Sequence, residues 1–209
     1  MSENHTFMPG EEFIQKLLAG ERDFRRVRLE PYFNLSGDEA FSTLQEYLKG
    51  EDLENAPVLL ERADLSGIDA DGWHLPFVKA NGIKLKHATL MQAMLAYSVF
   101  RNADFRYARL PQTSLMNCDL EGVDFRQADL NMAKLNQSSL KGADIAGTNL
   151  LFANLEATHI HGVVNLGLAQ SVATANFQFV SLTEQEKSTI RMELWAQEGK
   201  KLRLFGGSG

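Results

Sequence analysis

The sequence predicts a mainly β solenoid, a four-sided β-helix with helical segments near both of its ends. Three observations support this fold class: a five-residue period through the middle of the chain, a column of small residues in register with it, and a change of period in both flanks. The 209 residues, 44% of them apolar, suffice for a packed core and argue against disorder.

The five-residue period defines the predicted core. Every fifth position from 65 to 160 is apolar, and 18 of these 20 residues are Leu, Phe or Ile. Fifteen of them are the strongest core candidates: Leu65, Leu90, Leu95, Phe100, Phe105, Leu110, Leu115, Leu120, Phe125, Leu130, Leu135, Leu140, Ile145, Leu150 and Leu155. The residue two positions earlier is mostly Ala, Ser or Thr.

Neither regular element explains this spacing, because positions five apart scatter around a helix and alternate between the faces of a strand. The chain must therefore turn once per repeat. Four repeats then close a square coil, and successive coils stack at roughly 4.8 Å, so that residues 20 apart lie above one another.

Short triplets carry a resemblance to a known family. Ala-Asp-Leu at 63–65 and 128–130, Ala-Asp-Phe at 103–105 and Ala-Asn-Leu at 153–155 resemble the A(D/N)LXX consensus of the pentapeptide-repeat family. The match covers residues 58–162, which hold 21 repeats. The resemblance implies a right-handed quadrilateral β-helix of bacterial origin, and the stretch LLAGERDF at 17–24 resembles the opening of many cyanobacterial members.

Four early repeats depart from the pattern. Ile68 with Ala70 and Val78 with Ala80 exchange the large and small positions, which keeps the volume inside the coil. Ile83 with Leu85 is not compensated in this way, and neither is Trp73 with Leu75. We expect Trp73 either to distort its corner or to pack under the N-terminal segment.

Residues 1–57 are predicted to form an N-terminal cap. Phe13, Ile14, Leu17 and Leu18 have helical spacing that stops at Gly20. First repeats are expected at about 22–31, followed by an interruption at about 31–57. Ser36 and Glu39 have the spacing of a capping box, which predicts a helix inserted into the first coil.

The predicted β-helix covers residues 58–165. The five-residue period that defines it ends at Asn165. Residues 166–205 are predicted to form an irregular coil and a C-terminal helix, with a capping box at Ser181 and Glu184. An apolar stripe of Ile190, Leu194 and Trp195 would cap the last coil or pair with a second copy in a homodimer. Residues 206–209, Gly-Gly-Ser-Gly, are typical of an artificial linker.

Charge and hydropathy restrict the class of partner. The net charge is −6, but residues 60–165 hold 11 acidic and 10 basic residues, so a basic nucleic-acid footprint and an acidic DNA-like shell are both missing there. The chain has no run of 18 apolar residues and no secretory signal at its start. We therefore expect a cytoplasmic protein that binds neither nucleic acid nor membrane.

Outward positions predict where a partner would bind. Two adjacent faces of the solenoid gather methionine and aromatic residues, which are favoured at protein interfaces. The candidate interaction surface comprises Phe77, Met91, Met94, Tyr97, Pro111, Met116, Met132, Leu151 and Phe152. The other two faces are charged. The apolar faces are either covered by the protein's own helices or exposed to a partner or second copy, two interpretations that the sequence leaves open.

The sequence contains no residue pattern that indicates an enzyme. His159 and His161 point outward without a third ligand, Cys118 falls in the small inward column, and the sequence has no catalytic triad order, phosphate loop or CxxC. We expect no catalytic residue, cofactor or metal. The predicted function is a non-catalytic, regulatory protein-interaction scaffold. The alternative is a DNA mimic, because the resemblance extends to quinolone-resistance proteins that bind DNA gyrase; the balanced charge counts against it.

Overall fold

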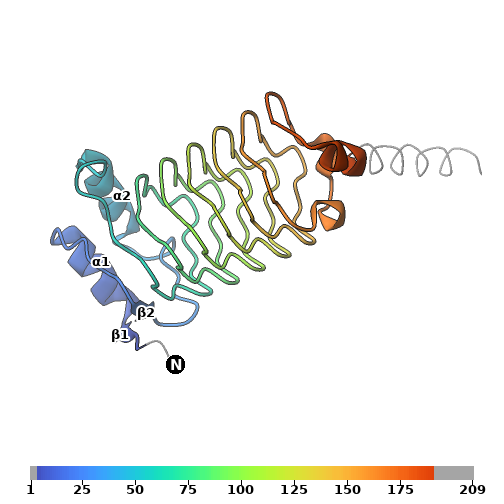
Figure 1. Ribbon diagram of the computed structural model, residues 1–209. Helices are drawn as coiled ribbons and strands as arrows, with labels where there is room; N and C mark the ends of the chain where they lie inside the picture. Colours follow the sequence, from blue (N-terminus) through green and yellow to red (C-terminus); the bar gives the residue numbers. More distant parts are fainter. Residues whose placement is uncertain (1–3, 191–209) are drawn as a thin grey trace, which may run out of the picture.

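The protein, described by a computed structural model over residues 4–190, is a rod of stacked square coils (Figure 1). Parallel single-residue bridges link positions 20 apart, as in Lys84 with Asp104 and Asp104 with Asp124. The bridges form four columns, one on each side of the square. Each rung is too short to be a regular strand, so the β structure between residues 58 and 164 consists of bridges and turns.

The two predicted inward columns are buried. All 20 residues at every fifth position from 65 to 160 lie in the core, and none is more than 4% exposed. The small column is buried as well, and the hydroxyls of Thr113, Ser138, Thr148 and Thr158 donate to carbonyls of the preceding coil. Thr148 Oγ1, for example, donates to the Phe125 carbonyl at 2.7 Å. Small polar residues therefore fit a dry core because the backbone supplies their acceptors.

Each corner is made by a residue in the left-handed region. Every fifth position from 62 to 162 has a positive φ, and most of these residues are not glycine. The left-handed conformation costs a non-glycine residue roughly 1–2 kcal/mol. The corner is closed by a hydrogen bond such as the one from Ala63 N–H to the Leu60 carbonyl at 3.0 Å.

Helix α1 (Gly10–Leu18) covers the N-terminal end of the rod (Figure 1). Its Phe13, Ile14 and Leu17 are fully buried. The Phe13 ring meets Phe24 edge-on at 4.8 Å and Trp73 at 6.3 Å between ring centroids. Trp73 thus packs under the N-terminal segment, the second of the two predicted outcomes, and its neighbour His74 keeps the regular bridge to Met94.

Strand β1 (Thr6–Met8) precedes α1 and pairs in parallel with β2 (Val27–Leu29). The sequence did not predict it. β1 adds one rung above the first coil on a single side of the square, since β2 in turn bridges to Asp64 through Arg28.

The first coil is longer than predicted. Asn34 bridges to Asp69, so the repeats continue through Leu35 and the interruption begins after that residue, not at about 31. Arg28 and Asn34 are six residues apart, whereas their partners Asp64 and Asp69 are five apart. This additional residue hid the third repeat from a search for a strict five-residue period.

Helix α2 (Phe41–Gly50) forms within the interruption as predicted and packs beside α1. Its predicted capping box was wrong: the helix is capped at Ala40 without a side-chain hydrogen bond, and Ser36 Oγ donates to Asp69 instead, at 2.7 Å. On the fourth side of the square, Gln45 Oε1 of α2 accepts a hydrogen bond from His74 N–H at 2.6 Å. A helix side chain thereby replaces the carbonyl that the missing rung would supply.

The five-residue spacing ends at Asn165, as predicted, but the stacking continues. Two short 3₁₀ helices, η1 (Leu166–Leu168) and η2 (Val172–Thr174), lengthen the corners. Gln170 still bridges to Asn149, and Asn176 to Asn154. The β-helical stacking therefore reaches beyond residue 165.

A helix follows over residues 184–190. Its capping box is formed by Thr183 and Glu186, not by Ser181 and Glu184: Glu186 N–H bonds Thr183 Oγ1 at 3.2 Å, and Thr183 N–H bonds Glu186 Oε2 at 2.6 Å. Both pairs have the S/T-x-x-E spacing, so the sequence could not distinguish them. Ile190 packs against the core. Leu194 and Trp195 of the predicted stripe lie outside the described residues.

Candidate protein-interaction surface

The nine predicted surface residues project from two neighbouring sides of the square, near the corners that bound them. Five of them are exposed, by 38–63%: Met91, Met94, Tyr97, Met132 and Phe152. The other four, Phe77, Pro111, Met116 and Leu151, are half-buried. We call these nine residues the apolar surface.

Stacking of successive coils orders the apolar surface. The rings of Phe77 and Tyr97, 20 residues apart on one corner, stack at 5.2 Å between centroids with an interplanar angle of 13°. Both residues have positive φ, which directs their side chains away from the core. Because the backbone fixes the corners, the direction in which each of these side chains leaves the rod is fixed as well.

The described helices do not cover the apolar surface. Helices α1 and α2 lie across the N-terminal end of the rod, and their buried residues face the first coil and each other (Figure 1). The five exposed members keep their exposure with both helices in place. Among the described residues, helices α1 and α2 thus leave these five side chains exposed, whereas covering by the predicted C-terminal helix concerns residues that lie largely outside the described part of the chain.

Other exposed aromatic side chains were missed by the sequence interpretation. Tyr32 is 78% exposed at the lengthened corner of the first coil, and Tyr107 is 49% exposed on a charged side of the rod. The Tyr107 ring stacks on His87 at 5.0 Å, and Lys86 Nζ lies 5.6 Å from its centroid. The 20-residue spacing of His87 and Tyr107 could have predicted that their rings stack. The pair was missed because its neighbours in the sequence are charged.

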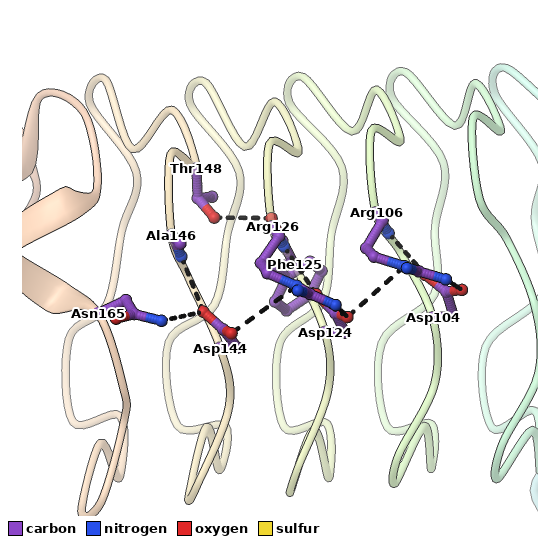
Figure 2. A network of polar contacts seen from close by, with 9 residues as sticks. All are labelled: Asp104, Arg106, Asp124, Phe125, Arg126, Asp144, Ala146, Thr148 and Asn165. Carbon is purple, nitrogen blue, oxygen red and sulfur yellow. Dashed lines mark hydrogen bonds and ion pairs between the residues drawn. The ribbon is translucent and has the colours of Figure 1, made fainter.

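One charged side carries a ladder of carboxylates and guanidinium groups (Figure 2). Arg106 forms two hydrogen bonds with Asp104, at 2.8 and 2.6 Å, and its Nε lies 3.6 Å from Asp124. Arg126 repeats this arrangement one coil later, with Asp124 and then Asp144. Each carboxylate of the ladder has a cationic neighbour, so the column does not act as an acidic stripe.

The pKa of Asp104 reflects this pairing. Burial raises the pKa of the carboxyl group, but the hydrogen bonds from the Arg106 side chain and backbone outweigh burial and hold the pKa below its usual value. The Asp104 partner raises the pKa of Arg106. Asp104 is thus an ionised, hydrogen-bonded group, which is unsuited to accept a proton as a general base near neutral pH.

Reactive groups are scarce in the described part of the chain. Cys118 is buried, and burial raises the pKa of its thiol to about 12, which suppresses the reactive thiolate. His159 and His161 are exposed, and residues 4–190 contain no group of three His, Cys, Asp or Glu side chains that could hold a metal ion. No helix of this region is long and apolar enough to cross a bilayer.

Comparison with known proteins agrees with this architecture. A family model described as pentapeptide repeats matches residues 83–122 and 124–162 with eight copies. No curated protein sequence matches the chain.

Three solved structures illustrate the likeness. QnrB1, a plasmid-mediated fluoroquinolone resistance protein, is 17% identical; the match covers 65% of this chain and 84% of QnrB1, with a TM-score of 0.42. Rfr23 of the cyanobacterium Cyanothece is 24% identical over 55% of this chain and 91% of its own, with a TM-score of 0.32. HetL of the cyanobacterium Nostoc, involved in heterocyst differentiation regulation, is 16% identical over 84% and 95%, with a TM-score of 0.18.

Identities this low have no bearing on function. The family match identifies the central region: residues 83–122 and 124–162 are pentapeptide repeats, and proteins of this family fold as right-handed quadrilateral β-helices.

Proposed function

We propose that the chain is a non-enzymatic, cytoplasmic interaction scaffold that binds a partner protein through the apolar surface. The observation that carries the proposal is the set of exposed methionine and aromatic side chains on two adjacent sides of the rod. Large exposed apolar patches on soluble proteins mark binding sites more often than chance, and Met and aromatic residues are enriched at interfaces.

Rigidity strengthens this proposal. The corner residues Tyr97, Met132 and Phe152 have fixed left-handed backbones, and Tyr97 N–H bonds the Met116 carbonyl of the next coil at 2.9 Å. A preorganised surface loses little conformational entropy when a partner binds, which favours affinity. The alternative DNA-mimic function has less support, because the carboxylates of the ladder are neutralised by arginines.

The apolar surface can be tested with a triple variant, Met91→Asp, Tyr97→Asp and Phe152→Asp, used as bait in a lysate of the native organism. Asp tolerates the left-handed region better than most residues, so the fold should persist. We expect the bound proteins to fall at least tenfold. The matched control, Asn81→Asp, Asn102→Asp and Gln127→Asp, adds the same negative charge on other sides of the rod and should retain them. Equal binding by both variants would refute the proposal.

Homodimer formation through the C-terminal helix stays a prediction. Leu182 and Ile190, at the start of this segment, pack against the core, which favours capping of the last coil over pairing with a second copy. Light scattering on the purified chain should then give a monomer mass of about 23.3 kDa. A mass of twice that value would assign the helix to a dimer interface.

A further inference from the structure

A recess lies at the lengthened corner of the first coil. It has a volume of about 160 Å³, and its lining includes Arg28, Tyr32, Ser66, Lys86 and His87. We call it the Tyr32 groove. No residue of the apolar surface lines it.

The groove is built by two departures from the repeat. Arg28 and Asn34 are six positions apart in place of five, which lengthens the corner, and Tyr32 takes a positive φ of 60° with 78% of its surface exposed. One coil below, Gly67 has φ +75°, and a Cβ atom there would lie 2.8 Å from Tyr32 Cδ1. Any side chain at position 67 would therefore displace the Tyr32 ring. Because Gly67 has no side chain, the recess beside the ring stays open.

The other side of the groove is an aromatic stack. The His87 ring, one coil beyond Gly67, stacks on Tyr107 at 5.0 Å with an interplanar angle of 15°. Tyr32 and His87 therefore flank the recess from the two coils on either side of Gly67. A planar side chain entering the groove would meet aromatic surface on both sides.

The charge around the groove is locally positive. Among the described residues Arg28 makes no ion pair, and Lys86 makes none, although it lies over the Tyr107 ring. The Asp64 carboxylate also lines the recess and keeps its negative charge, while it accepts hydrogen bonds from the Ser66 hydroxyl at 2.7 Å and the Ser66 N–H at 3.2 Å. Two cations and one carboxylate, Asp64, therefore line the recess, an excess of one positive charge in a chain whose net charge is −6, so the attraction for an anion is local to this corner.

We propose that the Tyr32 groove binds a short acidic peptide segment with an aromatic residue, presented by the partner protein. This inference rests on the proposed scaffold function and adds a second contact with a defined partner chemistry. The recess is smaller than the roughly 300–1,000 Å³ of small-molecule sites, and it fits a single aromatic side chain. The ring would lie between Tyr32 and His87, and flanking carboxylates would face Arg28 and Lys86.

A nucleic acid strand fits less well. Stacking between aromatic rings suits a base, but a strand leaving the groove along this side of the rod would run over Asp104, Asp124 and Asp144 (Figure 2). A continuous phosphate backbone needs repeated cations, whereas these arginines are already paired with carboxylates. A short acidic segment requires only the positive end of this side.

The test uses fluorescence polarisation with the full chain and a fluorescein-labelled peptide, Glu-Glu-Trp-Asp-Glu, at low salt. We expect saturable binding that weakens at least about tenfold with Tyr32→Ala or Lys86→Glu, and that weakens with salt because exposed charges are screened within about 10 Å at 0.1 M. Lys79→Glu, the same charge change on another side of the rod, should weaken binding less than about twofold. The peptide with Gly in place of Trp should bind at least about tenfold more weakly.

Three results would overturn the inference: no saturation up to about 1 mM peptide, an equal loss with Lys79→Glu, or tighter binding of a single-stranded oligonucleotide than of the peptide. Circular dichroism confirms that each variant is folded. The triple Asp variant of the apolar surface should bind the peptide as the unchanged chain does. If this variant still captures partner proteins while the unchanged chain binds the peptide, the apolar surface alone is refuted. If the variant loses partner capture but the unchanged chain does not bind the peptide, the groove alone is refuted.

Discussion

Truncation of one core leucine measures how strongly the dry axis stabilises the rod. Leu130 is 1% exposed at the centre of the β-helix, and its N–H bonds the Asn149 carbonyl at 2.9 Å. Leu130→Ala removes buried apolar volume and leaves a cavity. Such substitutions cost about 2–5 kcal/mol, depending on how far the surroundings collapse. Backbone hydrogen bonds fix the spacing of the coils on all four sides, so we expect the surroundings to collapse little into the cavity. The free energy of unfolding should therefore fall by about 3–5 kcal/mol.

Urea unfolding followed by circular dichroism provides the measurement, with the free energy of unfolding taken from the midpoint and the m-value. The control is Lys134→Ala, an exposed outward residue four positions later, which should change stability by less than about 0.5 kcal/mol. A loss below about 1 kcal/mol for Leu130→Ala, at an unchanged m-value, would refute the claim that this column carries the core.

Two further predictions concern titrating groups. Because burial raises the pKa of Cys118 from its usual value near 9 to about 12, its thiolate fraction at pH 8 is about a thousandfold lower, and Ellman's reagent should react only after denaturant is added; rapid reaction of the folded chain would contradict this. Because the folded-state pKa of Asp104 is lowered, its carboxylate stabilises the fold above about pH 4, and this contribution is lost as the pH falls further. Asp104→Asn should therefore show a smaller fall in Tm between pH 5 and pH 3, and an identical fall in both proteins would exclude the Arg106 pairing as its source.

The core was predictable because the repeat places each residue type in the same environment many times. A single departure from period, such as Trp73 in the small column, could be absorbed without loss of register, and the structure confirms that the inward columns stay buried. The five-residue spacing alone fixes which positions face the axis, since the chain must turn once in each repeat.

The ends were predicted less accurately because non-local contacts decide them. The third early repeat, at Asn34, becomes visible only through its bridge to Asp69, 35 residues away. Strand β1 contains three residues and forms because β2 offers an open edge. The choice of Thr183 over Ser181 as a cap depends on the position at which the chain leaves the last coil, because two equivalent capping patterns lie within the six residues 181–186.

By itself the sequence determined the repeat, the inward columns and the residues of the apolar surface. Only the tertiary structure decided that this surface is left open by α1 and α2, that arginines neutralise the aspartates of the ladder, and that Tyr32 and His87 flank a recess over Gly67. The physical reason is the separation in sequence of the residues that interact. A period can be recognised from residues close together in sequence. The exposure of a side chain and its ion pairs depend on residues of adjacent coils, which stacking brings together from 20 or more positions away.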